Sequence, residues 1–171
     1  MPDVPSLDAR AYDREAVAVG PEQVRDVCIE ILAKAPDITS TTSWSDSGRP
    51  CGLLIAFSSG ARLWTAITTA GATDTDPSAE APAAAPPLPA LFDDAGKITA
   101  TRAEQYLTAV LLAGLAPQIA SAYGYSTTSP AQHPGVGLYL ADGARAFLPF
   151  IYTAAHGKKP HTRPFHLDAA F

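Results

Sequence analysis

The sequence is poor in charged residues, in cysteine and in long hydrophobic runs. Only 17% of its 171 residues are charged, and the formal net charge is −5. A chain with this balance does not bind polyanions with its whole surface, although a local basic patch can still bind nucleic acid. Because 47% of the residues are apolar, the composition is that of a globular chain rather than a disordered one. The length fits one domain or two tightly joined halves.

The scarcity of cysteine and of long apolar runs bears on where in the cell the protein is expected to be found. Cys28 and Cys51 are expected on an apolar helix face and at a strand start, where thiols are typically buried and reduced, although spacing alone does not decide whether they pair. The longest apolar run, within residues 106–120, is too short to span a bilayer and is interrupted by glycine and proline. The first residues lack the basic-then-apolar pattern of a signal peptide. We therefore expect a cytoplasmic protein without membrane contacts.

Motifs of known catalytic chemistry are also missing. No Gly-x-Ser-x-Gly elbow surrounds Ser58 or Ser59, and the chain has neither a phosphate-binding loop nor a Gly-x-Gly-x-x-Gly segment. Cys51 has no discernible histidine partner. Asp93 and Asp94 lie beside a predicted linker, where the geometry of general acid–base catalysis is hard to hold. The sequence therefore favours a protein that is not an enzyme, and we predict no catalytic residue and no cofactor. No motif in it resembles a known family.

The sequence does contain a weak internal repeat. Residues 52–69 read as an apolar strand, a Ser-Gly turn and a second strand, and residues 137–153 repeat this pattern around an Asp-Gly turn. Each segment has Gly-Ala-Arg at its turn, with Gly60 and Gly143 lying 83 residues apart, and each follows a helix that opens with Glu-Gln. We interpret the two segments as copies of one helix-plus-hairpin unit.

Helices are predicted before both hairpins. The first, at residues 21–35, has an apolar stripe at helical spacing and is stopped by Pro36. The second begins at residues 101–104, Thr-Arg-Ala-Glu, a capping-box pattern. It is apolar on almost every side as far as Ile119, and Pro117 should kink or end it. A helix that is apolar all round is sandwiched in a core or lies at a partner interface.

Strand patterns complete the fold prediction. The Thr-rich stretch at 37–45 indicates an exposed or edge strand, and Pro149 indicates an edge or a bulge in the last strand. If residues 16–19 and 96–98 are strands, each half reads β-α-β-β-β. The predicted class is α+β, with two halves packed as one domain and helices on one sheet face. The segments are an extended arm (1–14), a first half (15–70), a mobile Pro/Ala-rich linker (71–99), a second half (100–155) and a basic extended tail (156–171).

Candidate binding residues come from the repeat and from the second helix. The two arginines just after the turns either grip an anionic ligand as a pair or form local ion pairs. An aromatic residue in each hairpin either lines a pocket between the halves or belongs to the core. The apolar second helix is a candidate partner surface. The predicted ligand- or partner-binding residues are Arg62, Trp64, Arg145, Phe147, Tyr106 and Leu112.

The C-terminal tail contains the only basic cluster. Lys158, Lys159 and Arg163 are the predicted nucleic-acid contacts, with Phe165 available to stack on a base. The acidic body and the lack of a nucleic-acid-binding signature argue against this role. Three histidines spaced by five occur in the same tail, but a Pro-containing coil does not hold metal ligands rigidly and the nearby lysines repel a cation. No metal site is predicted.

These observations favour a non-catalytic binding or assembly protein. It is expected to contact a protein partner or a second copy of itself through the apolar helix or a strand edge. One alternative is a small-ligand-binding or enzymatic protein with a pocket between its two halves. Another is nucleic-acid binding through the basic tail.

Overall fold

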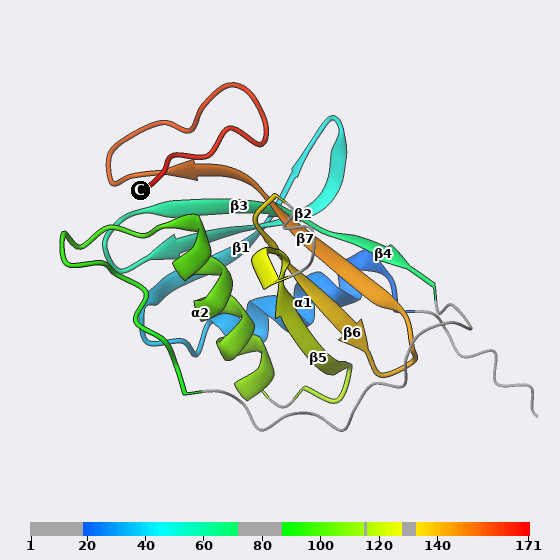
Figure 1. Ribbon diagram of the computed structural model, residues 1–171. Helices are drawn as coiled ribbons and strands as arrows, with labels where there is room; N and C mark the ends of the chain where they lie inside the picture. The colour runs from blue at the N-terminus through cyan, green and yellow to red at the C-terminus, as the bar shows by residue number, and fades with distance from the viewer. Residues whose placement is uncertain (1–18, 72–86, 115, 128–132) are drawn as a thin grey trace, which may run out of the picture.

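The computed structural model describes residues 19–71, 87–114, 116–127 and 133–171. These residues form two α-helices, one 3₁₀ turn and a seven-stranded antiparallel sheet, which confirms the predicted α+β class (Figure 1). The predicted arm at 1–14 and residues 72–86 of the predicted linker lie outside the described ranges. The elements are α1 (Pro21–Leu32), β1 (Ile38–Asp46), β2 (Arg49–Phe57), β3 (Arg62–Ala66), β4 (Thr68–Ala70), α2 (Ala100–Ala113), β5 (Ile119–Gly124), η1 (Tyr125–Thr127), β6 (Gly135–Leu140) and β7 (Arg145–Ala154).

The sheet has the order β1-β2-β3-β7-β6-β5, with β4 also paired to β7. Each half contributes a helix and then a three-stranded antiparallel meander, and the third strands of the two meanders, β3 and β7, pair with each other. The two hairpin turns have the same hydrogen bond, because Gly60 N–H donates to Phe57 O at 2.9 Å and Gly143 N–H donates to Leu140 O at 3.0 Å. Both glycines have a φ near +85°, where a side chain is disfavoured. The origin of the halves by duplication stays a prediction.

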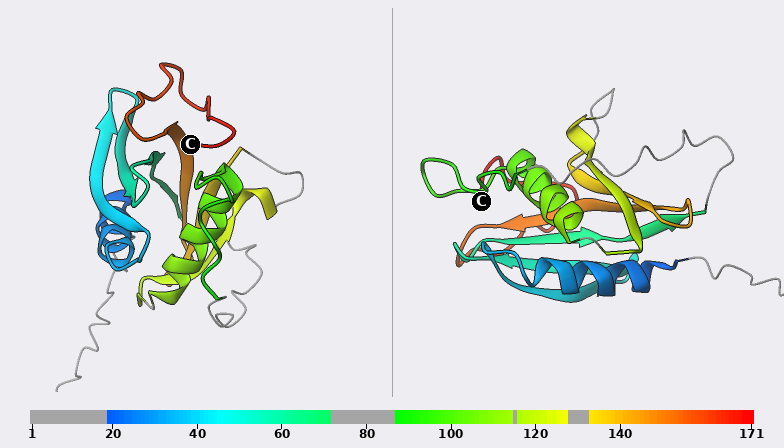
Figure 2. Two further views of the ribbon diagram at one scale, coloured as in Figure 1. Left: turned by 90° about the vertical axis from the view of Figure 1, so that its left-hand side faces the viewer. Right: turned by 90° about the horizontal axis from the view of Figure 1, so that it is seen from below.

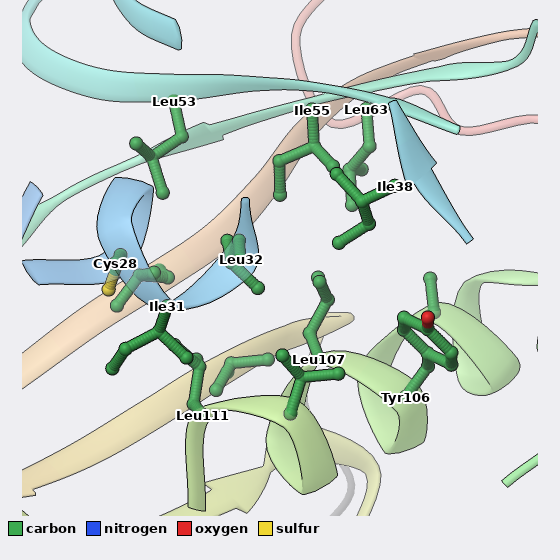
Figure 3. Packing of buried hydrophobic residues seen from close by; sticks show 14 of the residues in the cluster. Cys28, Ile31, Leu32, Ile38, Leu53, Ile55, Leu63, Tyr106, Leu107 and Leu111 are labelled. Atoms are coloured by element: carbon green, nitrogen blue, oxygen red, sulfur yellow. The ribbon is translucent and has the colours of Figure 1, made fainter. Parts of the chain in front are cut away.

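One face of the sheet carries the core, and both helices pack on it. α1 buries the stripe predicted from its periodicity, namely Val24, Cys28, Ile31 and Leu32, and it ends three residues before the predicted boundary. Figure 3 shows Leu53, Ile55 and Leu63 of the sheet pointing toward Leu107 and Leu111 of α2. Each such buried side chain contributes about 1.5–3 kcal/mol. The opposite face of the sheet, which we call the outer face, has no helix on it among the described residues (Figure 2).

The predictions for individual strands are largely confirmed. β1 lies at the sheet edge, as the Thr-rich stretch indicated, whereas β7, the strand with Pro149, is not at an edge but lies between β3 and β6. Pro149 lies inside β7, where β4 pairs with β7 only as far as Phe147 and β3 only from Phe150 onward. The missing N–H of proline therefore falls at a gap in the ladder. The ladder is also irregular here, because Trp64 pairs with Tyr152 while Thr65 pairs with Phe150.

The predicted start and end of the second helix are wrong. α2 is capped by Thr99, whose Oγ1 accepts the N–H of Arg102 at 3.2 Å, and not by a Thr101–Glu104 capping box. The carboxylate of Glu104 faces the protein interior instead. The helix ends at Ala113, before Pro117, and Ile119 belongs to β5.

The predicted strand at 96–98 is also wrong. Ile98 instead exchanges two backbone hydrogen bonds with Phe171, at 2.8 and 2.9 Å. Of the predicted strand at 16–19, only Val19 lies within the described residues, and it is not in a strand. As far as the structure describes them, the first half therefore reads α-β-β-β-β, with the short β4 after β3, and the second half reads α-β-β-β, with η1 between β5 and β6.

Glycines on the outer face leave room for aromatic rings from neighbouring strands. Gly52 of β2 pairs with Trp44 of β1, and a Cβ on Gly52 would lie 2.9 Å from Trp44 Cε3 and 2.2 Å from Thr65 O. In the other half, Gly137 of β6 pairs with Tyr123 of β5, and a Cβ there would lie 2.2 Å from the ring. An aromatic residue thus covers a strand glycine in each meander, an arrangement that protects the backbone at a position without a side chain.

The substitution Gly52→Ala should destabilise the protein by about 2–3 kcal/mol, because its Cβ would overlap a backbone oxygen that has no room to move. Urea unfolding followed by circular dichroism measures this change. The matched control is Gly48→Ala in the same hairpin, where the nearest atom, Asp46 Oδ1, lies 3.8 Å from the added Cβ. This control should stay within about 0.5 kcal/mol of the wild type. Equal effects of the two changes would contradict the packing that we describe.

Candidate functional site

β1 forms an edge of the sheet, and its own sequence contains few residues that would block pairing with another strand. Among the described strands it pairs only with β2. Six of its nine residues are serine or threonine, and its single charge, on Asp46, is engaged by Arg49 at 2.7 Å. Natural edge strands are usually blocked by lysine, proline or a bulge, because their unpaired backbone groups invite another strand. Register shifts occur only at the two ends of β1, which leaves Ser40–Trp44 regular.

Of the two alternatives for a helix that is apolar all round, α2 takes the first and packs in the core of this chain. Tyr106 is fully buried, and its hydroxyl oxygen accepts the backbone N–H of Asp37 at 3.1 Å. Burial raises the pKa of Tyr106 to about 12, so the phenol is neutral at physiological pH. Leu112 is half-buried. The apolar sides of α2 thus belong mainly to the core of this chain, and Tyr106 is not available to a partner in this structure.

A pocket of about 320 Å³ lies between α1 and α2. Its walls are apolar apart from Lys34, and Leu88, which is 46% exposed, also lines it. A second cavity of about 270 Å³ shares Ile31, Lys34 and Gly114 with the first. Because α1 and α2 come from different halves, this hollow lies between the halves, as the small-ligand alternative requires. Its lining does not include Trp64 or Phe147.

The structure separates the two predicted arginines. Arg62 lies opposite Ala154 of β7, and Arg145 lies nine positions earlier on that strand, which corresponds to roughly 30 Å. Each guanidinium instead covers a ring on the outer face: Arg62 lies 5.1 Å from Trp64, and Arg145 lies 5.0 Å from Tyr139. These cation–π contacts hold the arginines near the sheet. Sequence position alone suggested a pair, but the antiparallel β3–β7 ladder puts its members at opposite ends of β7.

The two predicted aromatic residues also lie apart. Trp64 pairs with Tyr152, whereas Phe147 pairs with Thr68 and Gly137. Both side chains are on the outer face, where Trp64 is 8% exposed and Phe147 is half-buried. The structure therefore does not bring these two rings together around one ligand.

Glu104 is a buried carboxylate that the sequence patterns misassigned. It is 1% exposed and accepts hydrogen bonds from Ser126 N–H at 3.1 Å, from the Ser126 hydroxyl and from Gly135 N–H at 3.0 Å. These neutral donors tie α2 to η1 and to the start of β6. A carboxylate that is already engaged in this way is suited to holding a loop rather than to taking a proton from a substrate. The sequence signal that could have revealed a buried role is that Glu104 is the one acidic residue of α2.

The cysteines are free and buried, as predicted. Burial raises the pKa of Cys28 to about 12 and also raises the pKa of Cys51. A thiol that stays protonated is a poor nucleophile. Neither cysteine is therefore a suitable catalytic group.

The described residues offer neither a metal site nor a membrane-spanning helix. Within 19–71, 87–114, 116–127 and 133–171, no group of three histidine, cysteine or acidic side chains is placed to hold a metal ion. Neither α1 nor α2, the helices that the structure describes, is long and apolar enough to cross a bilayer.

The chain matches no protein-family model, no curated protein and no solved structure. Its function therefore has to be inferred from its own surfaces.

The substitution Glu104→Gln should destabilise the fold by about 2 kcal/mol, because the amide replaces an acceptor oxygen with N–H groups that face other donors. Urea unfolding measures the change. Glu30→Gln, at an exposed position of α1, is the matched control and should have little effect. If the two variants were equally stable, the contacts of Glu104 with Ser126 and Gly135 would not be structural.

Proposed function

We propose that this protein is a non-catalytic assembly protein whose β1 edge pairs with β1 of a second copy. The observation that supports the proposal is the exposed, nearly uncharged edge of nine residues. Strand addition to such an edge satisfies backbone N–H and C=O groups that water otherwise satisfies. The burial of α2 makes the strand edge a better candidate than the helix for this contact.

The sequence of β1 is compatible with pairing to itself. In an antiparallel pair centred on Thr42, Asp46 of one copy lies opposite Ile38 of the other, so like charges do not meet. Ser40 then lies opposite Trp44, and Trp44 is only half-buried in the single chain. A two-fold axis at Thr42 makes the contact isologous and closed. An edge contact of this length buries little area, so we expect a weak dimer with a Kd in about the micromolar range.

The substitution Thr42→Lys should shift the dimer to monomer and raise its Kd by about tenfold or more. In an antiparallel pair the two new ammonium groups would face each other across the axis and repel. Light scattering coupled to size-exclusion chromatography, over a range of protein concentrations, measures the mass. The matched control is Thr68→Lys, at an exposed position of β4, and it should dimerise like the wild type. A wild-type protein that is monomeric at millimolar concentration would disprove the proposal.

The pocket between α1 and α2 supports a second candidate function, the binding of a small apolar ligand. Its volume of about 320 Å³ is at the low end for ligand sites, which are typically apolar with few polar groups. Lys34 provides one cation at the wall, so a ligand with an apolar body and one anionic group fits best. This candidate is independent of the β1 contact, because β1 does not line the pocket.

The dye 1-anilinonaphthalene-8-sulfonate has this chemistry and is a suitable probe. Its fluorescence should rise on binding to the wild type, and Ala113→Trp should abolish the rise because the indole fills the pocket. Ala33→Trp places the same ring on an exposed position at the end of α1, outside the pocket lining, and should leave dye binding unchanged. Equal dye binding by both variants would rule out the pocket as the site.

A further inference from the structure

The C-terminal residues fold back along β7 (Figures 1 and 2), and the last of them, Phe171, is buried in the hydrophobic core. Phe165 N–H donates to Ile151 O at 2.9 Å, and Asp168 N–H donates to Thr153 Oγ1 at 3.2 Å. The chain then reaches Ile98 through the backbone bonds of Phe171. The basic residues of this segment are therefore held at a defined place on the body.

Phe165 is the most unusual residue of this segment. Its φ is 66°, a left-handed conformation that costs a residue with a side chain about 1–2 kcal/mol. The residue is nevertheless 47% exposed, so burial in the core does not offset the strain. Arg49 lies 5.6 Å from the ring centre, and the imidazole of His133 meets the ring edge-on at 5.1 Å. Strained backbone conformations are frequent at binding sites. Here the strained residue exposes an aromatic side chain to solvent.

A second group of rings lies on the outer face, around the residue that follows Ile151 in β7. Tyr152 stands edge-to-face between Trp44 and Trp64, with ring centres at 6.0 and 6.3 Å. It follows Ile151, the residue to which Phe165 is hydrogen-bonded. Trp44 and Tyr152 are half-buried and keep part of their surface open. Trp44, Tyr152 and Trp64 thus form one cluster of rings, and the backbone bond of Phe165 to Ile151 connects the C-terminal segment to the strand that carries Tyr152.

Positively charged side chains lie near these rings. Arg62 covers Trp64 and donates to Lys158 O at 2.8 Å. Lys158, Lys159 and Arg163 are all exposed, and Asp168, the one acid of residues 155–171, is engaged by His161 at 2.9 Å. This segment is therefore positive although the whole chain has a net charge of −5. At physiological salt, charges beyond about 8 Å are screened, so the local balance decides what binds here.

We propose that this surface binds single-stranded nucleic acid. We call it the aromatic–basic surface and define it by Trp44, Arg62, Tyr152, Lys158, Arg163 and Phe165. Exposed rings stack on unpaired bases without regard to sequence, and neighbouring cations contact the phosphates. An acidic peptide also attracts cations, but it makes no use of a strained, exposed phenyl ring. A duplex hides its base faces, so the rings favour a single strand.

The test measures the fluorescence anisotropy of a labelled twenty-nucleotide oligo(dT) with the full chain over a range of salt concentrations. The wild type should bind at low salt and weaken as salt rises. The triple variant Lys158→Ala, Lys159→Ala, Arg163→Ala should lower the slope of log K against log salt by about 2, since each phosphate contact on a single strand contributes about 0.7. Failure of the wild type to bind at 50 mM salt would overturn the proposal.

A second variant separates stacking from charge. Phe165→Asn keeps a residue that tolerates the left-handed conformation but removes the ring, and it should weaken binding about tenfold without changing the salt slope. The control Lys97→Ala removes an exposed lysine outside this surface and should change neither quantity. Urea unfolding verifies that each variant is folded.

Competitors identify the polymer class. Polyglutamate should compete poorly with oligo(dT), and a duplex of the same length should bind more weakly than the single strand. If polyglutamate competes as well as unlabelled oligo(dT) and Phe165→Asn has no effect, the surface is a site for acidic polymers and the nucleic-acid proposal is wrong. Dimerisation through β1 is measured without any ligand, so the two proposals fail separately.

Discussion

The pairing of β3 with β7 is the interaction on which the rest of the structure depends. A half of about 50–60 residues buries a smaller fraction of its surface than the whole chain does and is correspondingly marginal by itself. When the third strands pair, the two meanders become one sheet, and α1 and α2 come together over a single core. The close approach of the helices is visible at Gly114, where a Cβ would lie 2.6 Å from Ile31. Each half thus completes the hydrophobic core of the other.

This arrangement determines which surfaces remain for binding. The apolar sides of both helices face the shared core, and Tyr106 is buried there. Among the described residues, the surfaces that remain include the edges at β1 and β5, the hollow where the helices meet, and the outer face with its arginines and aromatic rings. The C-terminal residues add cations to one part of that face. The three proposed contacts follow from this division, because each uses a surface that the β3–β7 pairing leaves uncovered.

Features governed by neighbouring residues were predictable from the sequence. The stripe of α1, the Gly60 and Gly143 turns and the edge strand at β1 depend on periodicity, on backbone conformation and on polarity over a few positions. Glu104 shows where this reasoning fails. Its spacing from Thr101 matches a capping box, but Thr99 already caps the helix, and the carboxylate meets donors from Ser126 and Gly135 that are distant in sequence. Local rules contain no information about those donors.

The sequence by itself determined the class of the fold, most of its elements and the absence of familiar catalytic motifs, since these depend on composition and short-range pattern. Only the tertiary structure decided which candidate residues meet. Arg62 and Arg145 look equivalent along the chain, yet an antiparallel ladder places them at opposite ends of β7. Arg49, His133 and Phe165 look unrelated along the chain, yet Arg49 and His133 both contact the Phe165 ring. The physical reason is that strand register and the return of the C-terminal residues are contacts between distant segments, which no local pattern specifies.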